Sequence, residues 1–269
     1  MKPENMLDQL VALVQAGARY RAISGDLIRQ VGAQELSKGR TLKEAVKATR
    51  NKLHQVGGAY QEQAIDYSHW KKELATISHG ENDQELKNFC TRMMALHAST
   101  RERLPILERF FTTTLARLGP IHSVLDLACG LNPLALPWMP LAEDAVYYGC
   151  DVYSDIVEFL NTFLAYLGRQ GEVSCCNLAG EVPTYPVQVA LLLKTLPCLE
   201  QVDKKIGTRL LGKIQAEHLL VSFPAHSLGG RSKGMVKNYS SNFAELIADQ
   251  SWKVQRFEFS SELVYLLSR

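Results

Sequence analysis

The sequence predicts an α/β fold: a mostly parallel, seven-stranded sheet with helices between its strands, preceded by a smaller all-helical N-terminal domain. Three observations predict it. Apolar residues recur at helical spacing through the first hundred residues, and no strand-like alternation occurs before residue 120. Beyond that point, short apolar runs alternate with helical stretches, which is typical of parallel strands joined by crossover helices. Two final runs, 253–259 and 261–267, are joined tightly and indicate an antiparallel pair at the sheet edge.

The front of the chain reads as a series of helices. They are expected at residues 7–14, 24–31, 42–56, 66–77 and 83–96. The third has the clearest limits, because Thr41 and Glu44 form a capping-box pattern before it and Gly57-Gly58 follows it. Since 269 residues lie near the size at which one hydrophobic core divides, we expect two domains, over residues 1–95 and 96–269.

The second domain opens with a helix and continues as a sheet. A capping-box pattern of Ser99 with Glu102 predicts a helix that runs to about Leu118 and that Pro105 kinks. After Gly119-Pro120 we expect five strands, at residues 123–129, 145–150, 172–176, 187–193 and 218–223, and two helices, at residues 154–167 and 199–214.

The composition excludes several classes of protein. Hydrophobic residues make up 46% and charged residues 22% of the chain, as in ordinary globular proteins. No apolar run approaches the roughly 20 residues that cross a bilayer, and the N-terminus lacks the pattern of a secretory signal. The six cysteines form no C-x-x-C pair and no zinc-type spacing with histidine, so we interpret them as free thiols in a reducing cytosol. We therefore expect a cytoplasmic protein without a membrane anchor or a bound metal.

Basic residues gather in two parts of the chain. Residues 19–52 carry nine basic and three acidic residues, and residues 226–241 carry Arg231, Lys233 and Lys237 with no acid. Such local excess is typical of a surface that binds a polyanion, although a solvated helix face gives the same pattern. The candidates for contact with nucleic acid are Arg50, Lys52, His54, Arg231 and Lys233.

A glycine turn and an acidic residue mark a candidate nucleoside site. The first strand of the sheet runs into Gly130, and Asp151 closes the second strand 21 residues later, the usual separation for an acid that binds a ribose diol. Only one glycine is present where a dinucleotide-binding fold has G-x-G-x-x-G, so the sequence lacks the glycines that form a diphosphate-binding site. S-adenosylmethionine, which has an adenosine and no phosphate, fits this pattern. In the alternative interpretation Gly130 merely turns the chain.

The residues around this turn resemble a known family. The stretch 128–136, with Asn-Pro after the glycine, is similar to the first motif of the aminoglycoside-resistance 16S rRNA methyltransferases, which modify N7 of guanine 1405 in the decoding site. Further similar stretches occur in the same order along the whole chain, at residues 52–60, 96–103, 222–235 and 262–266. The resemblance implies a class I methyltransferase (Rossmann-like) sheet and S-adenosylmethionine as the cofactor.

The resemblance also implies roles for individual residues. Asp151 would bind the ribose hydroxyls, and Ala128 with Gly130 would line the methionine side. Asn177 and Leu178 would flank the adenine; Asn177 stands where class I enzymes often have an acid. The other implied cofactor contacts are Tyr60, His97, Ala98, Ser99, Leu193 and Arg103, the last as a partner for the methionine carboxylate.

The implied reaction needs no general base, because guanine N7 carries a lone pair and no proton, and we therefore expect no catalytic acid or base. Phe223 and Trp138 are candidates to stack on the target base, with ordinary packing as the alternative. The implied partner is 16S rRNA within the small ribosomal subunit, and no protein partner is implied. Two other functions stay open: methylation of another base of the same site, such as adenine N1, and a non-catalytic cofactor-binding module in RNA assembly.

Overall fold

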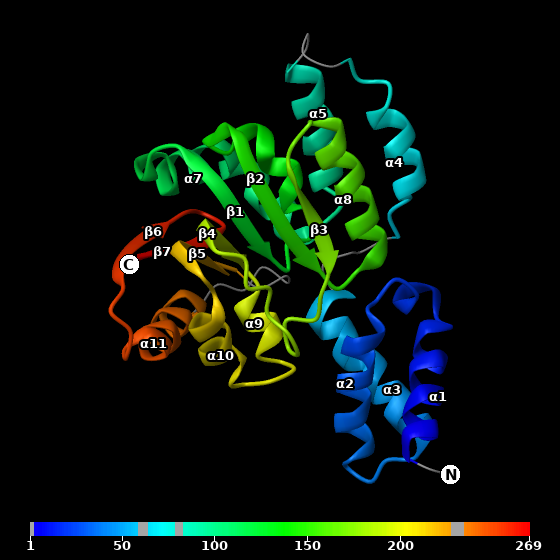
Figure 1. Cartoon of the computed structure of the whole chain (residues 1–269). Helices are drawn as coiled ribbons and strands as arrows, with labels where there is room; N and C mark the ends of the chain where they lie inside the picture. Colours follow the sequence, from blue (N-terminus) through cyan, green and yellow to red (C-terminus); the bar gives the residue numbers. More distant parts are fainter. Residues whose placement is uncertain (1–2, 59–63, 79–82, 227–233) are drawn as a thin grey trace.

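The chain folds around a seven-stranded sheet in strand order β3-β2-β1-β4-β5-β7-β6 (Figure 1). The computed structural model describes residues 3–58, 64–78, 83–226 and 234–269. Its strands are β1 Ile121–Leu127, β2 Leu141–Asp151, β3 Gly171–Cys175, β4 Val187–Leu193, β5 Ala216–Pro224, β6 Lys253–Glu258 and β7 Glu262–Ser268. Strands β1 to β5 are parallel, and β7 runs antiparallel to both β5 and β6. The predicted class I methyltransferase fold, with its antiparallel hairpin, is confirmed.

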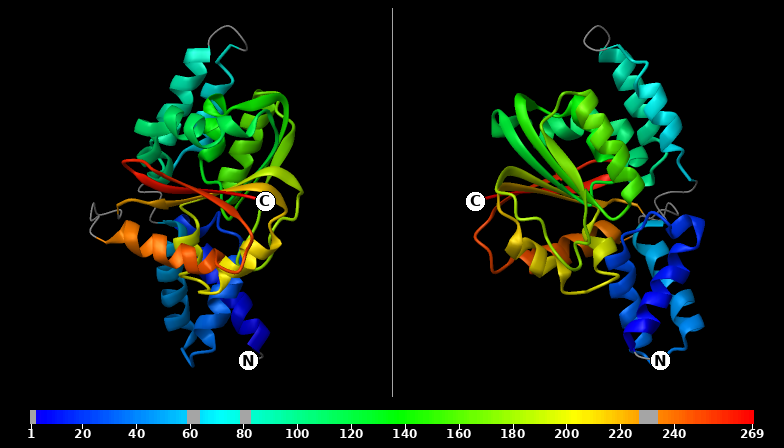
Figure 2. Two further views of the ribbon diagram at one scale, coloured as in Figure 1. Left: turned by 90° about the vertical axis from the view of Figure 1, so that its left-hand side faces the viewer. Right: turned by 45° about the vertical axis from the view of Figure 1, so that its right-hand side comes forward.

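Helices cover both faces of the sheet (Figure 2). Helix α8, Ser154–Tyr166, packs against β2 and β3 on one face, where it buries Phe159 and Phe163. The short α9, Leu196–Leu199, and the helices α10, Ile206–Lys213, and α11, Met235–Ile247, lie on the other face. Parallel strands covered on both sides are apolar throughout, and β4 is accordingly buried along nearly its whole length.

Three N-terminal helices form a small bundle of their own. They are α1, Pro3–Gln15, α2, Gly25–Leu36, and α3, Leu42–Leu53. The predicted capping box of α3 is confirmed: the backbone N–H of Thr41 donates to Glu44 Oε2 at 2.9 Å, and the N–H of Glu44 donates to Thr41 Oγ1 at 3.4 Å. A π-helical turn, η2 His54–Gly58, follows α3.

The next two helices pack on the sheet domain. Helix α4, Tyr67–Leu74, contacts α8, and helix α5, Asp83–Met94, contacts the 3₁₀ segment η5, Asn132–Trp138. In the first contact the Tyr67 ring lies 5.4 Å from that of Phe159. Of the N-terminal helices, α1 to α3 thus form the bundle, whereas α4 and α5 cover the sheet domain. The domain boundary near residue 95 stays a prediction.

The helix expected over residues 99–118 is broken into four pieces. These are α6 Ala98–Arg103, η3 Leu104–Ile106, α7 Leu107–Thr114 and η4 Ala116–Leu118. The break at Pro105 is the expected one, because proline cannot donate to the preceding turn. The predicted capping box of Ser99 and Glu102 is wrong: the N-cap of α6 is His97, two residues before Ser99, and Glu102 instead pairs with Lys194 at 2.7 Å.

Two further differences lie in the second half of the chain. The helix expected over residues 199–214 is divided into α9 and α10, because a turn intervenes in which Asp203 accepts a hydrogen bond from the N–H of Lys205 at 2.9 Å. Helix α11 was not expected. Within the described part of the chain, no helix is both long and apolar enough to span a membrane.

Candidate functional site

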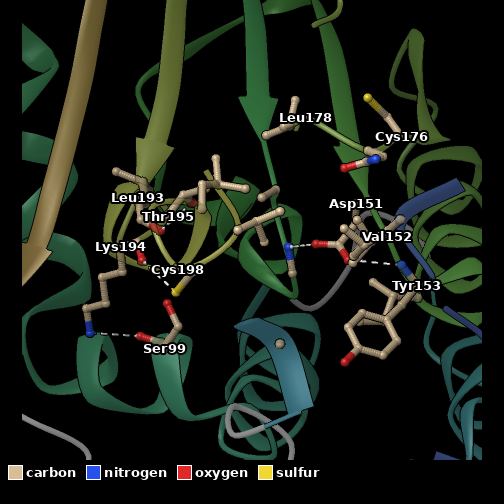
Figure 3. A pocket seen from close by; sticks show the side chains of 18 of the residues that line it. Ser99, Asp151, Val152, Tyr153, Cys176, Leu178, Leu193, Lys194, Thr195 and Cys198 are labelled. Carbon is tan, nitrogen blue, oxygen red and sulfur yellow. Dashed lines mark hydrogen bonds between the residues drawn. The ribbon is translucent and has the colours of Figure 1, made fainter. Parts of the chain in front are cut away.

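A pocket opens where β1, β2, β3 and β4 end, at the carboxyl edge of the parallel sheet (Figure 3). Parallel α/β sheets bind their ligands at this edge. Eight of the residues that the sequence singled out line the pocket: His97, Ser99, Ala128, Gly130, Asp151, Asn177, Leu178 and Leu193. The topology therefore brings together side chains from four strand ends and from the start of α6.

Asp151 is the central acid of this pocket. Its carboxylate is buried, with Oδ2 accepting from the Gly130 backbone N–H at 2.8 Å and Oδ1 accepting from the Tyr153 N–H at 3.2 Å (Figure 3). Burial raises the pKa of Asp151, and these backbone hydrogen bonds act against that rise. The carboxylate thus ties the ends of β1 and β2 together and presents a fixed acceptor to the pocket.

The glycine turn after β1 requires its glycine for two reasons. Gly130 has a φ of +50°, in the left-handed region that side chains disfavour. A Cβ on Gly130 would also lie only 3.2 Å from the ring of His97. Ala128, with a φ of +53°, adopts a similar conformation two residues earlier. The turn therefore brings bare backbone to the pocket with the His97 ring packed against it.

Arg103 departs from the expected role, because it does not line the pocket. Its buried guanidinium donates to Glu262 Oε1 at 2.8 Å and Oε2 at 3.1 Å, and to Asn132 Oδ1 at 2.8 Å. The group also lies over the Phe110 ring, 4.9 Å from its centroid. These contacts place Arg103 in the framework beside the pocket, and its expected contact with a cofactor carboxylate stays a prediction.

Two other expected cofactor residues are not placed in the pocket. Ala98 is buried in α6 and is not among the lining residues. Tyr60 lies outside the described residues, so its role stays a prediction.

Lys194 is a pocket residue that the sequence reasoning missed. It follows β4 with a φ of +58°, and its buried Nζ donates to Glu102 at 2.7 Å. The same Nζ donates to the Ser99 carbonyl at 3.2 Å (Figure 3). The same Nζ lies 3.4 Å from Glu262. Burial alone would raise the pKa of Glu262, but Arg103 and Lys194 hold it below its ordinary value. A lysine directly after five buried apolar residues was the signal that could have found it.

The remaining lining residues are mostly apolar and come from elements on either side. They are Leu27, Gly57, Val152, Tyr153, Ile156, Cys176, Thr195, Cys198, Leu199 and Val202. Leu27 belongs to α2, so the N-terminal bundle forms part of the wall. Loop and helix positions of this kind carry no local sequence signal.

The candidate nucleic-acid contacts divide into structural and exposed residues. Arg50 donates to the Leu13 carbonyl, which closes α1, and lies 5.8 Å from the centroid of the Tyr20 ring. Lys52 donates to Gln34 at 3.2 Å, and partial burial, followed by the charge of Lys38, lowers its pKa. His54 is exposed. Arg231 and Lys233 lie outside the described residues.

The candidate stacking residues do not line the pocket. Phe223 is buried in an aromatic cluster, 5.1 Å from the Tyr239 ring and 5.3 Å from the Phe243 ring. Trp138 ends η5 before β2 begins, and it is half-buried against the core. The packing interpretation therefore describes both residues better than base stacking.

The site fits an adenosine-containing cofactor without phosphates. A buried carboxylate faces the pocket at the end of β2, the glycine turn admits close approach, and the walls are largely apolar. Among the described residues, no group of three His, Cys, Asp or Glu side chains could hold a metal ion. Together with the seven-stranded sheet, these features define an S-adenosylmethionine-dependent methyltransferase of class I.

Comparison with known proteins places the chain within that class. Residues 16–266 match the family model of the ribosomal RNA methyltransferase FmrO. A 16S rRNA (guanine(1405)-N(7))-methyltransferase of Micromonospora echinospora is 34% identical over 99% of this chain and 98% of its own length, and one of Frankia casuarinae is 35% identical over 99% and 95%. The crystal structure of the 16S rRNA methyltransferase RmtF with S-adenosyl-L-homocysteine has a TM-score of 0.86 and 32% identity over 100% of this chain and 99% of that one. The chain belongs to the FmrO family of ribosomal RNA methyltransferases.

Proposed function

We propose that this protein transfers a methyl group from S-adenosylmethionine to N7 of guanine 1405 of 16S rRNA in the small ribosomal subunit, and so confers aminoglycoside resistance. The observation that carries the proposal is the Asp151–Gly130 pocket in a chain that matches enzymes of this activity along its full length. A methyl group and its positive charge at guanine 1405 would stand where the drug docks. Since ribosomes are the substrate, we place the protein in the cytoplasm.

The residues of the pocket support a mechanism of positioning. The cofactor supplies a methyl group on a cationic sulfur, and guanine N7, which has a lone pair and no proton, can take it without a base. Asp151 is suited to hold the ribose hydroxyls, since its carboxylate is itself fixed by two backbone N–H groups. Burial, with the charges of Lys194 and Arg103, lowers the pKa of His97 to about 4, so the imidazole at the glycine turn is neutral at pH 7. Alignment of this kind is worth up to about 7–11 kcal/mol of the barrier in favourable cases.

The N-terminal bundle is suited to contact the small ribosomal subunit. Lys43 and Lys47 are exposed one turn apart on α3, and His54 is exposed just after that helix. The basic stretch over residues 227–233, which follows β5 in the sequence, lies outside the described residues and stays a predicted phosphate contact. Guanine N7 lies in the deep, narrow major groove of A-form RNA, so the enzyme must meet distorted RNA or an extruded nucleotide.

The test is methyl transfer to purified small subunits with tritiated S-adenosylmethionine, followed by mapping of the modified base. We expect one methyl group per subunit at N7 of guanine 1405, and none with Asp151→Asn. A methyl group on adenine N1 would replace the proposal with the first alternative. Cofactor binding without any transfer would replace it with the non-catalytic module. In a host that carries this chain, we expect resistance to gentamicin and little resistance to neomycin.

A further inference from the structure

Three hydrogen bonds close a ring between the N-terminal bundle and the loop after β3. Asn177 Nδ2 donates to Gln30 Oε1 at 2.7 Å, and Gln30 Nε2 donates to the Ala179 carbonyl at 3.3 Å. The Ala179 backbone N–H completes the ring by donating to Asn177 Oδ1 at 3.1 Å. Gln30 belongs to α2 and does not line the pocket, whereas Asn177 does. One side chain of the bundle therefore contacts the cofactor pocket through another residue.

The backbone of Ala179 fixes the orientation of both side-chain amides. Its N–H can only donate, so the oxygen of Asn177 must face it and the nitrogen of Asn177 must face Gln30. Its carbonyl can only accept, so the nitrogen of Gln30 must face it and the oxygen of Gln30 is left for Asn177. A single assignment of the oxygen and nitrogen positions of the two side-chain amides satisfies all three hydrogen bonds.

This ring also explains why an amide stands at position 177 where class I enzymes often have an acid. A carboxylate there would set an oxygen against Gln30 Oε1, and both would be acceptors. Turning the Gln30 amide over would remove that clash but would set its oxygen against the Ala179 carbonyl. Arg209 already donates to that carbonyl at 2.9 Å, which holds it in place.

The bundle is fixed to the neighbouring strand end as well. The N–H of Ser24 donates to the Val152 carbonyl at 2.8 Å, and the N–H of Ser154 donates to the Ala22 carbonyl at 2.8 Å. These two bonds hold the start of α2 against the residues that follow Asp151. Because α2 lies beneath the ends of β2 and β3 (Figure 1), these bonds hold Gln30 beside Asn177.

We propose that Gln30 is a positioning residue for the nucleoside subsite. It holds the Asn177 amide in one orientation, in which one N–H of Nδ2 and one lone pair of Oδ1 stay available to the adenine edge. The proposal rests on the proposed function, since it names a residue outside the pocket that sets how the pocket reads its cofactor.

The test is a double-mutant cycle of S-adenosylhomocysteine affinity, measured by titration calorimetry. With Asn177 present, we expect Gln30→Ala to raise the Kd about five- to tenfold, the usual effect of one lost hydrogen bond. With Asn177→Asp, the same Gln30→Ala change removes a facing acceptor, and we expect the Kd to stay unchanged or to fall. Gln34→Ala, one turn along α2, is the matched control, because Gln34 bonds Lys52 and does not line the pocket.

The sign of the coupling separates positioning from general destabilisation. An equal loss of affinity in both backgrounds, or a Gln30→Ala protein that binds like the wild type, would overturn the proposal. If Gln30→Ala fails to fold, Gln30→Met keeps the bulk of the side chain and serves in the same cycle. Wild-type protein that binds no S-adenosylhomocysteine would overturn the proposed function itself, and this inference with it.

Discussion

Arg103 and Glu262, 159 residues apart in the chain, form a bidentate ion pair in the core, with N–O distances of 2.8 and 3.1 Å. Arg103 ends α6, and Glu262 begins β7. Lys194, at the end of β4, lies 3.4 Å from the same carboxylate. The pair therefore fixes α6 and the strands β4 and β7 around the glycine turn, and Asn132 of η5 joins it through Arg103.

Glu262→Gln should destabilise the protein by about 3–5 kcal/mol, because it leaves the buried guanidinium of Arg103 without an anion and removes one of the two carboxylates beside Lys194. The measurement is urea unfolding at pH 7. Glu258→Gln is the control, since Glu258 is exposed and pairs only with Arg256 in the described structure; there we expect little change. Equal stability of the two variants would contradict the structural role given to this pair.

Gly130→Ala should lower both stability and cofactor affinity. The matched control is Gly168→Ala, because Gly168 has a similar φ of +60° but nothing within 4 Å of the new methyl group. Both variants lose about 1–2 kcal/mol to the left-handed backbone. Only Gly130→Ala must also displace the His97 ring, so its loss should be larger in thermal unfolding, and only it should weaken S-adenosylhomocysteine binding. Identical losses would show that the His97 contact has no consequence.

His97 should make stability depend on pH in a defined window. Its pKa in the folded state is about 4, against an ordinary value of 6.5. Between these values the unfolded chain binds a proton that the folded protein does not, so stability falls as the pH is lowered from 6.5 to 4. The difference in unfolding free energy between wild type and His97→Gln isolates this contribution from those of other groups. A difference that stays constant across the window would contradict the neutral imidazole.

Lys43→Ala with Lys47→Ala should weaken binding to the small subunit and leave cofactor affinity unchanged. If both lysines contact phosphates, the slope of log K against log salt should fall by about two. The control is Lys213→Ala with Lys253→Ala. These exposed lysines lie where the parallel strands begin, at the edge of the sheet opposite the pocket: Lys213 precedes β5, and Lys253 starts β6. A similar loss in both pairs would indicate a general charge effect without a defined docking face.

Local signals predicted much of the fold. The limits of β4 agree with the expected 187–193, because a run of apolar residues bounded by polar ones needs no distant partner to be recognised. The capping box of Thr41 and Glu44 was predicted for the same reason. The separation of Gly130 from Asp151 placed both at one sheet edge, since the carboxyl ends of parallel strands meet there.

Contacts between distant segments were not predictable in this way. The resemblance placed Arg103 against a cofactor carboxylate, and nothing near it in the sequence indicates that Glu262 occupies its guanidinium. The packing of α4 on α8, the conformation of Lys194 and the bond of Gln30 to Asn177 also depend on segments far apart in the chain.

The succession of strands, the glycine turn and the family membership were therefore determined by the sequence alone, because periodicity and motifs act over a few residues. Only the tertiary structure decided which charged and amide side chains face the pocket and which ones stabilise the elements around it. A buried ion or amide takes the partner that folding brings within about 3 Å, and that partner can lie anywhere in the chain.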